Sequence, residues 1–152
     1  RSLDCLTQSR KAAKEAVPME IERLATIAVD CGFRVHDGLG PGLLESVYEA
    51  VLAHSLTARG LAVERQKPVP IQLEGVVLNE GFRADLLVEG KLLIELKSLE
   101  RAAPVHGKQV LTYLRLLDLP LGLLMNFGAA TFKEGIKRVA NNRSSLRLSG
   151  FA

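Results

Sequence analysis

Apolar residues recur at helical spacing in two stretches near the start of the chain. Residues 20–35 carry such a stripe, which predicts a first helix. A turn at residues 37–42 precedes the second stripe, which consists of Leu44, Val47, Tyr48, Val51, Leu52 and Ser55. We expect this second helix to begin at Pro41, because proline is tolerated at the first helical position, and to end at Gly60.

From residue 62 the apolar period changes to two, which is the period of a β-strand. Residues 62–73 and 76–88 predict two strands, and Pro68 and Pro70 favour an edge position or a bulge in the first. Residues 91–97 predict a third strand, which is apolar on both sides and hence central and buried.

The rest of the pattern predicts a helix, a strand and a final helix. Pro104 opens the helix, which runs to about Leu117, and residues 121–127 form a continuous apolar strand. The last helix is expected over residues 131–141. The order α-α-β-β-β-α-β-α predicts a mixed α/β domain with a central sheet flanked by helices.

Composition is that of one globular domain: 152 residues, of which 47% are hydrophobic and 24% charged. We assign this domain to residues 19–142, with residues 1–18 as a flexible arm or an added remnant and residues 143–152 as a polar tail. No apolar run is long enough to cross a bilayer. Cys5 and Cys31 lack the spacing of a metal site or a disulfide framework, so we expect a cytoplasmic protein with no membrane partner.

The charge of the chain permits nucleic-acid binding without requiring it, since the net charge is only +3 and the pI about 9.0. Lys133, Lys137 and Arg138 are expected to fall near one face of the last helix. Together with other basic residues they could form a rim for phosphates, which comprises Arg65, Lys67, Arg83, Lys108, Arg115, Lys133, Lys137 and Arg138. No helix with base-reading character stands out, so sequence-specific binding is not predicted.

The stretch from Asp85 to Lys97 has the pattern D-x9-E-L-K across two predicted strands. A two-residue loop between the strands would place Asp85 and Glu95 on opposite faces of the hairpin. A three-residue loop with Gly90 in a left-handed conformation instead pairs Asp85 with Glu95, with Cβ atoms roughly 4.5–5.5 Å apart. Lys97 lies two residues after Glu95 and points to the same face. In this register two acids and one amine converge.

Two buried carboxylates at this distance repel each other, and proteins usually neutralise such a pair with a hard divalent cation such as Mg²⁺ or Mn²⁺. Such a cation activates water for attack on a phosphodiester, and the adjacent Lys97 can orient that water or stabilise the transition state. The alternative from spacing alone is a strand-end salt bridge between Glu95 and Lys97, with Asp85 in solvent.

Two helices carry further polar candidates. His106, Gln109 and Tyr113 share one face of the helix after Lys97, and this face suits contacts to a phosphate or a water as well as a hydrated surface. We expect His106, Lys108 and Arg115 to contact nucleic acid. Glu45 lies at the border of the apolar stripe of the second helix, where acids are usually only solvated.

Four sequence blocks, in this order and spacing, resemble the GxxExxY protein family of the PD-(D/E)XK nuclease superfamily. They are GPGLLESVY from Gly40 to Tyr48, FRADLLVEGKLLIELKS, HGKQVLTYL and LGLLMNFG, and the resemblance covers about residues 21–140. It implies a restriction-endonuclease-like αβββαβ core with an extra N-terminal helix. It also implies Asp85 and Glu95 as Mg²⁺ ligands and Lys97 as the catalytic lysine. Ala84 stands where the superfamily name has proline.

The resemblance further implies that Glu45 is an additional acid near the metal and that Gln109 and Tyr113 line the site. The resulting hypothesis is a metal-dependent nuclease that acts on DNA, in preference to RNA, as a homodimer or with a guiding partner protein. One alternative is a nucleic-acid-binding or assembly module of the same fold with weak or no catalysis. Another is a metal-dependent enzyme that acts on a nucleotide or other small phosphate ester.

Overall fold

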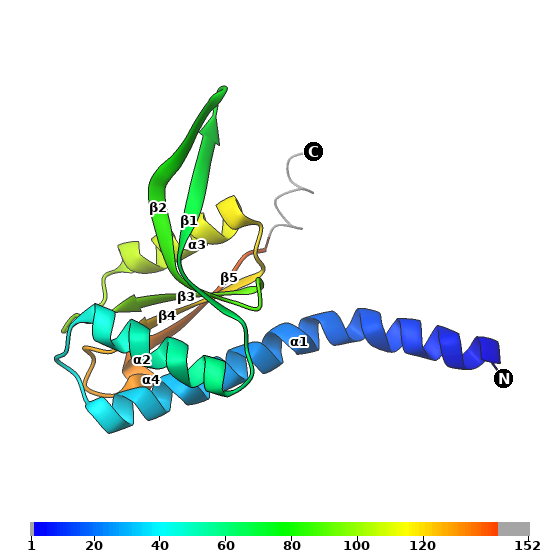
Figure 1. Ribbon diagram of the computed structural model, residues 1–152, viewed down its shortest axis with the longest axis horizontal. Helices are drawn as coiled ribbons and strands as arrows, with labels where there is room; N and C mark the ends of the chain where they lie inside the picture. The colour runs from blue at the N-terminus through cyan, green and yellow to red at the C-terminus, as the bar shows by residue number, and fades with distance from the viewer. Residues whose placement is uncertain (1, 143–152) are drawn as a thin grey trace.

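The computed structural model describes residues 2–142, and it describes the side chains of residues 20–79 and 81–142. Helices and strands follow one another in the order α-α-β-β-β-α-β-α-β (Figure 1). The elements are α1 (Ser2–Leu39), α2 (Glu45–Ala58), β1 (Val63–Leu73), β2 (Val76–Val88), β3 (Leu92–Lys97), α3 (Pro104–Leu117), β4 (Leu121–Asn126), α4 (Phe132–Gly135) and β5 (Ile136–Ala140).

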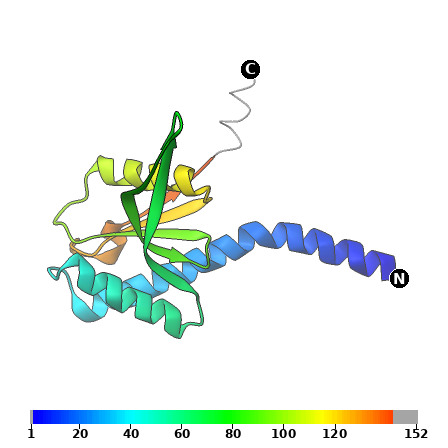
Figure 2. The same ribbon diagram turned by 45° about the horizontal axis from the view of Figure 1, so that its top comes forward.

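The five strands form one mixed sheet in the order β1-β2-β3-β4-β5. Neighbouring strands are antiparallel except for β3 and β4, which are parallel and are connected by α3. Helices α1 and α2 lie on one side of the sheet and α3 on the other (Figures 1 and 2). This is the expected αβββαβ core, from α2 to β4, with α1 as the extra N-terminal helix.

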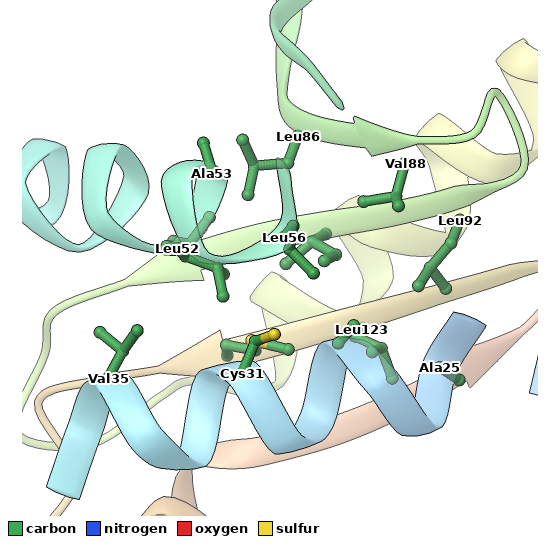
Figure 3. Packing of buried hydrophobic residues seen from close by; sticks show 14 of the residues in the cluster. Ala25, Cys31, Val35, Leu52, Ala53, Leu56, Leu86, Val88, Leu92 and Leu123 are labelled. Carbon is green, nitrogen blue, oxygen red and sulfur yellow. The ribbon is translucent and has the colours of Figure 1, made fainter. Parts of the chain in front are cut away.

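Each face of the sheet buries its own apolar cluster. Under α1 and α2, side chains such as Leu52 and Leu56 of α2 and Cys31 of α1 pack against Leu86 of β2 and Leu92 of β3 (Figure 3). On the other face Val110, Tyr113 and Leu114 of α3 pack against the sheet. Alternate residues of β3 therefore serve opposite cores, which explains its continuous apolar sequence.

The predicted strands 62–73, 76–88, 91–97 and 121–127 agree with the observed strands to within one residue at each end, and α3 has the predicted bounds. Three helix bounds were wrong. Helix α1 begins at Ser2 and runs to Leu39, and its residues 11–16 (KAAKEA) are rich in alanine, lysine and glutamate, which favour helix. Helix α2 begins at Glu45 and not at Pro41.

The late start of α2 follows from the backbone before it. Gly40 and Gly42 have positive φ angles of 72° and 103°, which interrupt any helix between α1 and Glu45. Leu44 is extended and occupies the N-cap position. The two glycines thus give residues 40–44 a non-helical loop conformation between α1 and α2.

The predicted last helix over residues 131–141 was wrong. Only the single turn of α4 is helical, and the chain then pairs as β5 with β4, from Leu121 opposite Ala140 to Met125 opposite Ile136. Phe132, Ile136 and Val139 have helical spacing, but β4 is buried and its backbone groups need a partner on that side. Lys133, Lys137 and Arg138 therefore do not share a helix face.

None of the described helices is both long enough and apolar enough to cross a membrane. The expected polar tail at residues 143–152 lies outside the described residues.

Candidate active site

The β2–β3 hairpin has the predicted register. Leu86 lies opposite Ile94 and Val88 opposite Leu92, which leaves a three-residue loop. The Lys91 N–H donates to the Val88 carbonyl at 3.0 Å, and Gly90 has the expected left-handed backbone with φ 65°. Glu89, with φ 54°, is left-handed as well, which was not expected.

Two hydrogen bonds from backbone N–H groups hold the carboxylates of Asp85 and Glu95 in place. The Asp85 N–H donates to Glu95 Oε1 at 2.9 Å, and the N–H of Leu96 donates to Asp85 Oδ2 at 2.8 Å. Glu95 is buried, with 5% of its surface exposed, and Asp85 is half-buried. The predicted convergence of the two carboxylates is confirmed, and neither acid points to the opposite face of the sheet.

The closeness of the two acids changes the pKa of Glu95. Burial raises the pKa of Glu95, and the negative charge of Asp85 raises it further, whereas the ammonium of Lys97 opposes the shift. A buried acid beside another acid is destabilised in its charged form unless a positive charge is near. A positive charge bound beside the pair would therefore favour its charged form.

Lys97 lies at the end of β3, two residues after Glu95, and is half-buried. Its positive charge acts on the pKa of both Glu95 and Glu45. Within residues 2–142 its ammonium makes no salt bridge, so the strand-end ion pair with Glu95 is not formed. The amine is left free to donate to a bound molecule.

Helix α2 brings a third acid to the same place. Glu45 is its first residue, and burial raises the pKa of its carboxyl group, with the charge of Asp85 as the second cause. The residue is exposed, and the charge of Lys97 opposes this shift. The role of Glu45 as an additional acid near a metal stays a prediction.

Tyr48 fixes the loop from which α2 starts. Its hydroxyl donates to the carbonyl of Gly40 at 2.5 Å and accepts the N–H of Leu43 at 3.1 Å. Its buried ring stacks on Phe127 with 4.6 Å between centroids. The Ser98 hydroxyl, directly after Lys97, donates to the carbonyl of Leu43 at 2.5 Å. Tyr48 and Ser98 thus fix the start of α2 relative to the end of β3.

Replacing Tyr48 by phenylalanine removes both of these hydrogen bonds and keeps the ring. We expect the free energy of unfolding to fall by about 1–2 kcal/mol, because two part-buried hydrogen bonds of the hydroxyl are lost. Urea denaturation measures this loss. Tyr113→Phe, whose hydroxyl bonds only to another side chain, is the matched control. A Tyr48→Phe protein as stable as the wild type would show that the hydroxyl does not hold the loop.

Helix α3 contributes Gln109 and Tyr113. The Gln109 amide donates to the Tyr113 hydroxyl at 3.0 Å. Burial raises the pKa of Tyr113, and the negative charge of Glu95 raises it further. The expectation that Gln109 and Tyr113 line the site stays a prediction.

The residues expected to contact nucleic acid are His106, Lys108 and Arg115 of α3. His106 Nδ1 accepts the N–H of Ala103 at 2.9 Å and so caps the start of α3. Lys108 and Arg115 are exposed on α3, and no described contact links them to the carboxylates.

Within the predicted basic rim, three members are already in ion pairs. Arg65 pairs with Glu49, Lys67 with Glu64, and Arg138 with Glu22. These three side chains are therefore partly neutralised.

Three residues at the site were missed by sequence reasoning. Asn126, buried at the end of β4, accepts the Leu99 N–H and donates to the Leu99 carbonyl, both at 2.9 Å, and so clamps the chain after Lys97. An asparagine inside the apolar run LGLLMNF was a signal for such a role. Glu49 and Gln66 form a second network, which reaches Asp85.

The donor set fits a hard divalent cation with water and phosphate ligands. In the part of the chain that the structure describes, no three or more His, Cys, Asp or Glu residues form a complete metal-binding group. Mg²⁺ does not require one, since it commonly binds through one or two carboxylates and keeps several waters. Asp85 Oδ2 and Glu95 Oε1 each accept a backbone N–H, and Asp85 Oδ1 accepts from the Gln66 amide at 3.3 Å. A carboxylate oxygen has two lone pairs, so Asp85 Oδ1 can still bind a cation, as can Glu95 Oε2.

Comparison with known proteins gives one family. The family model described as "PD-(D/E)XK nuclease superfamily" matches residues 22–139. The comparison with curated proteins found no match. Among solved structures, one titled "Crystal structure of SSO0001" is similar, with 20% sequence identity and a TM-score of 0.47. The similarity covers 70% of this chain and 56% of that chain, so this chain spans little more than half the length of that structure.

Proposed function

The chain belongs to the PD-(D/E)XK nuclease superfamily, and from this premise we propose that it is a metal-dependent nuclease that hydrolyses phosphodiester bonds of DNA or RNA. The proposed site residues come from β2 and β3, from α2 on one face of the sheet and from α3 on the other. The observation that carries the proposal is that backbone N–H groups of β2 and β3 hold the carboxylates of Asp85 and Glu95 side by side. Lys97 lies two residues after Glu95, and its ammonium has no salt bridge among the described side chains.

In this proposal Asp85 and Glu95 hold the cation, Mg²⁺ or Mn²⁺. When bound, such a cation supplies water activation and neutralises charge that develops on a phosphodiester. Lys97 donates to the attacking water or to a phosphate oxygen in the transition state, where its charge is worth most in a site partly shielded from water. Gln109 and Tyr113 border the reacting group from α3, and Glu45 adds an acid from α2.

Within the superfamily we propose the GxxExxY family. The motif residues support this assignment because each has a distinct physical task. Gly42 has a φ of 103°, which favours glycine. Glu45 opens α2 beside the carboxylates, and Tyr48 holds the loop that contains Gly42. The contacts of Lys108, His106 and Arg115 with nucleic acid, the preference for DNA, the homodimer or guiding partner and the cytoplasmic setting stay predictions.

The test is incubation of the protein with end-labelled single- and double-stranded DNA and RNA, each with Mg²⁺, Mn²⁺ or EDTA. We expect cleavage of at least one of these polymers with a divalent cation and none with EDTA. Binding without cleavage under all conditions would contradict the proposal and support a binding or assembly module. In a parallel incubation with free nucleotides, hydrolysis of the nucleotides without cleavage of any polymer would support an enzyme acting on small phosphate esters.

A further inference from the structure

Gln66 occupies an unusual position on β1. Its neighbours Arg65 and Lys67 lie opposite Leu86 and Ala84 of β2, so Gln66 lies opposite Asp85. Its backbone is left-handed, with φ 52°, inside a strand whose flanking residues continue the pairing. A glutamine pays conformational free energy for this backbone that glycine would avoid. Such strain persists where surrounding contacts hold it, and it clusters at functional sites.

The Gln66 side chain bridges two acids from different elements. Its amide Nε2 donates to Glu49 Oε1 of α2 and, at 3.3 Å, to Asp85 Oδ1 of β2. Glu49 is buried, with 6% of its surface exposed. The Arg65 guanidinium contacts Glu49 Oε2 at 3.0 and 3.3 Å, so the charge of Glu49 is balanced from the other side. Glu49 is therefore a fixed anchor for the Gln66 amide.

The two oxygens of Asp85 are thereby held from opposite directions. Leu96 N–H holds Oδ2 at 2.8 Å, and Gln66 approaches Oδ1. With only one of these contacts, the carboxylate could rotate about its Cβ–Cγ bond. With both, the plane of the carboxylate is set before a cation arrives, and less entropy is lost on binding.

We propose that Gln66 is a positioning residue, which orients the Asp85 carboxylate from its anchor on Glu49 and so raises the affinity of the site for a divalent cation. The inference rests on the proposed function, because it takes Asp85 as a ligand. Residues that orient metal ligands by hydrogen bonds commonly change metal affinity about 10- to 100-fold when they are replaced. Gln66 thereby extends the site from the β2–β3 hairpin to β1 and α2.

The test measures two quantities for the full chain. The electron paramagnetic resonance signal of free Mn²⁺ gives the affinity for Mn²⁺, and urea denaturation gives the stability. Gln66→Gly relieves the left-handed backbone but also removes the donor to buried Glu49 Oε1, so these two effects on stability oppose each other and urea denaturation measures their sum. We expect the dissociation constant for Mn²⁺ to rise about 10-fold or more while the protein remains folded without urea. Weaker binding by a protein that is still folded separates a positioning role from a general loss of structure.

Gln72→Ala is the matched control, because Gln72 is an exposed glutamine of the same strand, opposite Val77 and far along the β1–β2 ribbon. It should bind Mn²⁺ as the wild type does. If Gln66→Gly also binds Mn²⁺ with wild-type affinity, the positioning role is overturned and the proposed function stands. If the wild type itself binds no Mn²⁺, the metal site of the proposed function fails and this inference fails with it.

Discussion

Replacing Lys97 by methionine is expected to slow phosphodiester cleavage by about 10²–10³-fold, the usual effect of removing one donor that stabilises a transition state. Methionine keeps much of the length and apolar bulk of the lysine stem, so the end of β3 should remain folded. The ammonium makes no salt bridge within residues 2–142, so the loss of stability should be small. The rate is measured in single-turnover assays at saturating Mg²⁺.

Lys91→Met provides the control for this variant. Lys91 lies just before the opposite end of β3 and pairs with Glu20 at 2.7 Å, far from Asp85 along the hairpin. Its replacement should leave the cleavage rate unchanged. Equal rates for Lys97→Met and the wild type would remove Lys97 from the mechanism. Equal losses for the two lysine variants would point to a general effect of charge on substrate binding.

Replacing Asp85 by asparagine is expected to weaken Mn²⁺ binding by about 100-fold or more and to abolish detectable cleavage, because one of only two carboxylates at the centre loses its charge. The asparagine oxygen can still accept the N–H of Leu96, so the hairpin keeps its register. In EDTA the variant should be at least as stable as the wild type, because Glu95 no longer faces a second negative charge.

Asp37→Asn is the matched control, since Asp37 is exposed near the end of α1. This variant should bind Mn²⁺ and cleave as the wild type does. Calorimetric titration with Mn²⁺ and urea denaturation in EDTA together measure the two expected changes in Asp85→Asn. Wild-type Mn²⁺ affinity in that protein would show that Asp85 is not a ligand.

The hairpin that carries the site was predictable because its determinants are local. A period of two in the apolar residues identifies β2, a continuous apolar run identifies β3, and Gly90 marks the turn between them. Turn length sets which residues face each other, and the three-residue loop with a left-handed Gly90 was the one of the two possible loops that brings Asp85 and Glu95 together. Glu45 needed the family resemblance, because nothing in its own helix distinguishes it from a solvated acid.

The features that sequence reasoning missed depend on contacts between distant segments. Strand β5 forms because buried β4 needs a neighbour, whereas the local spacing of Phe132, Ile136 and Val139 favours a helix. Gln66 reaches Asp85 only because β1 pairs with β2 in one particular register. The clamp of Asn126 on Leu99 likewise joins residues 27 positions apart. Propensity and periodicity carry no information on such pairs.

Anomalous diffraction from crystals soaked in Mn²⁺ tests most directly the central claim that Asp85 and Glu95 share a divalent cation beside Lys97. The expected result is an anomalous peak in contact with both carboxylates in the wild type, and no peak there in Asp85→Asn crystals treated in the same way. A wild-type crystal with Mn²⁺ bound only elsewhere, or with no peak between these carboxylates at saturating Mn²⁺, would contradict the claim.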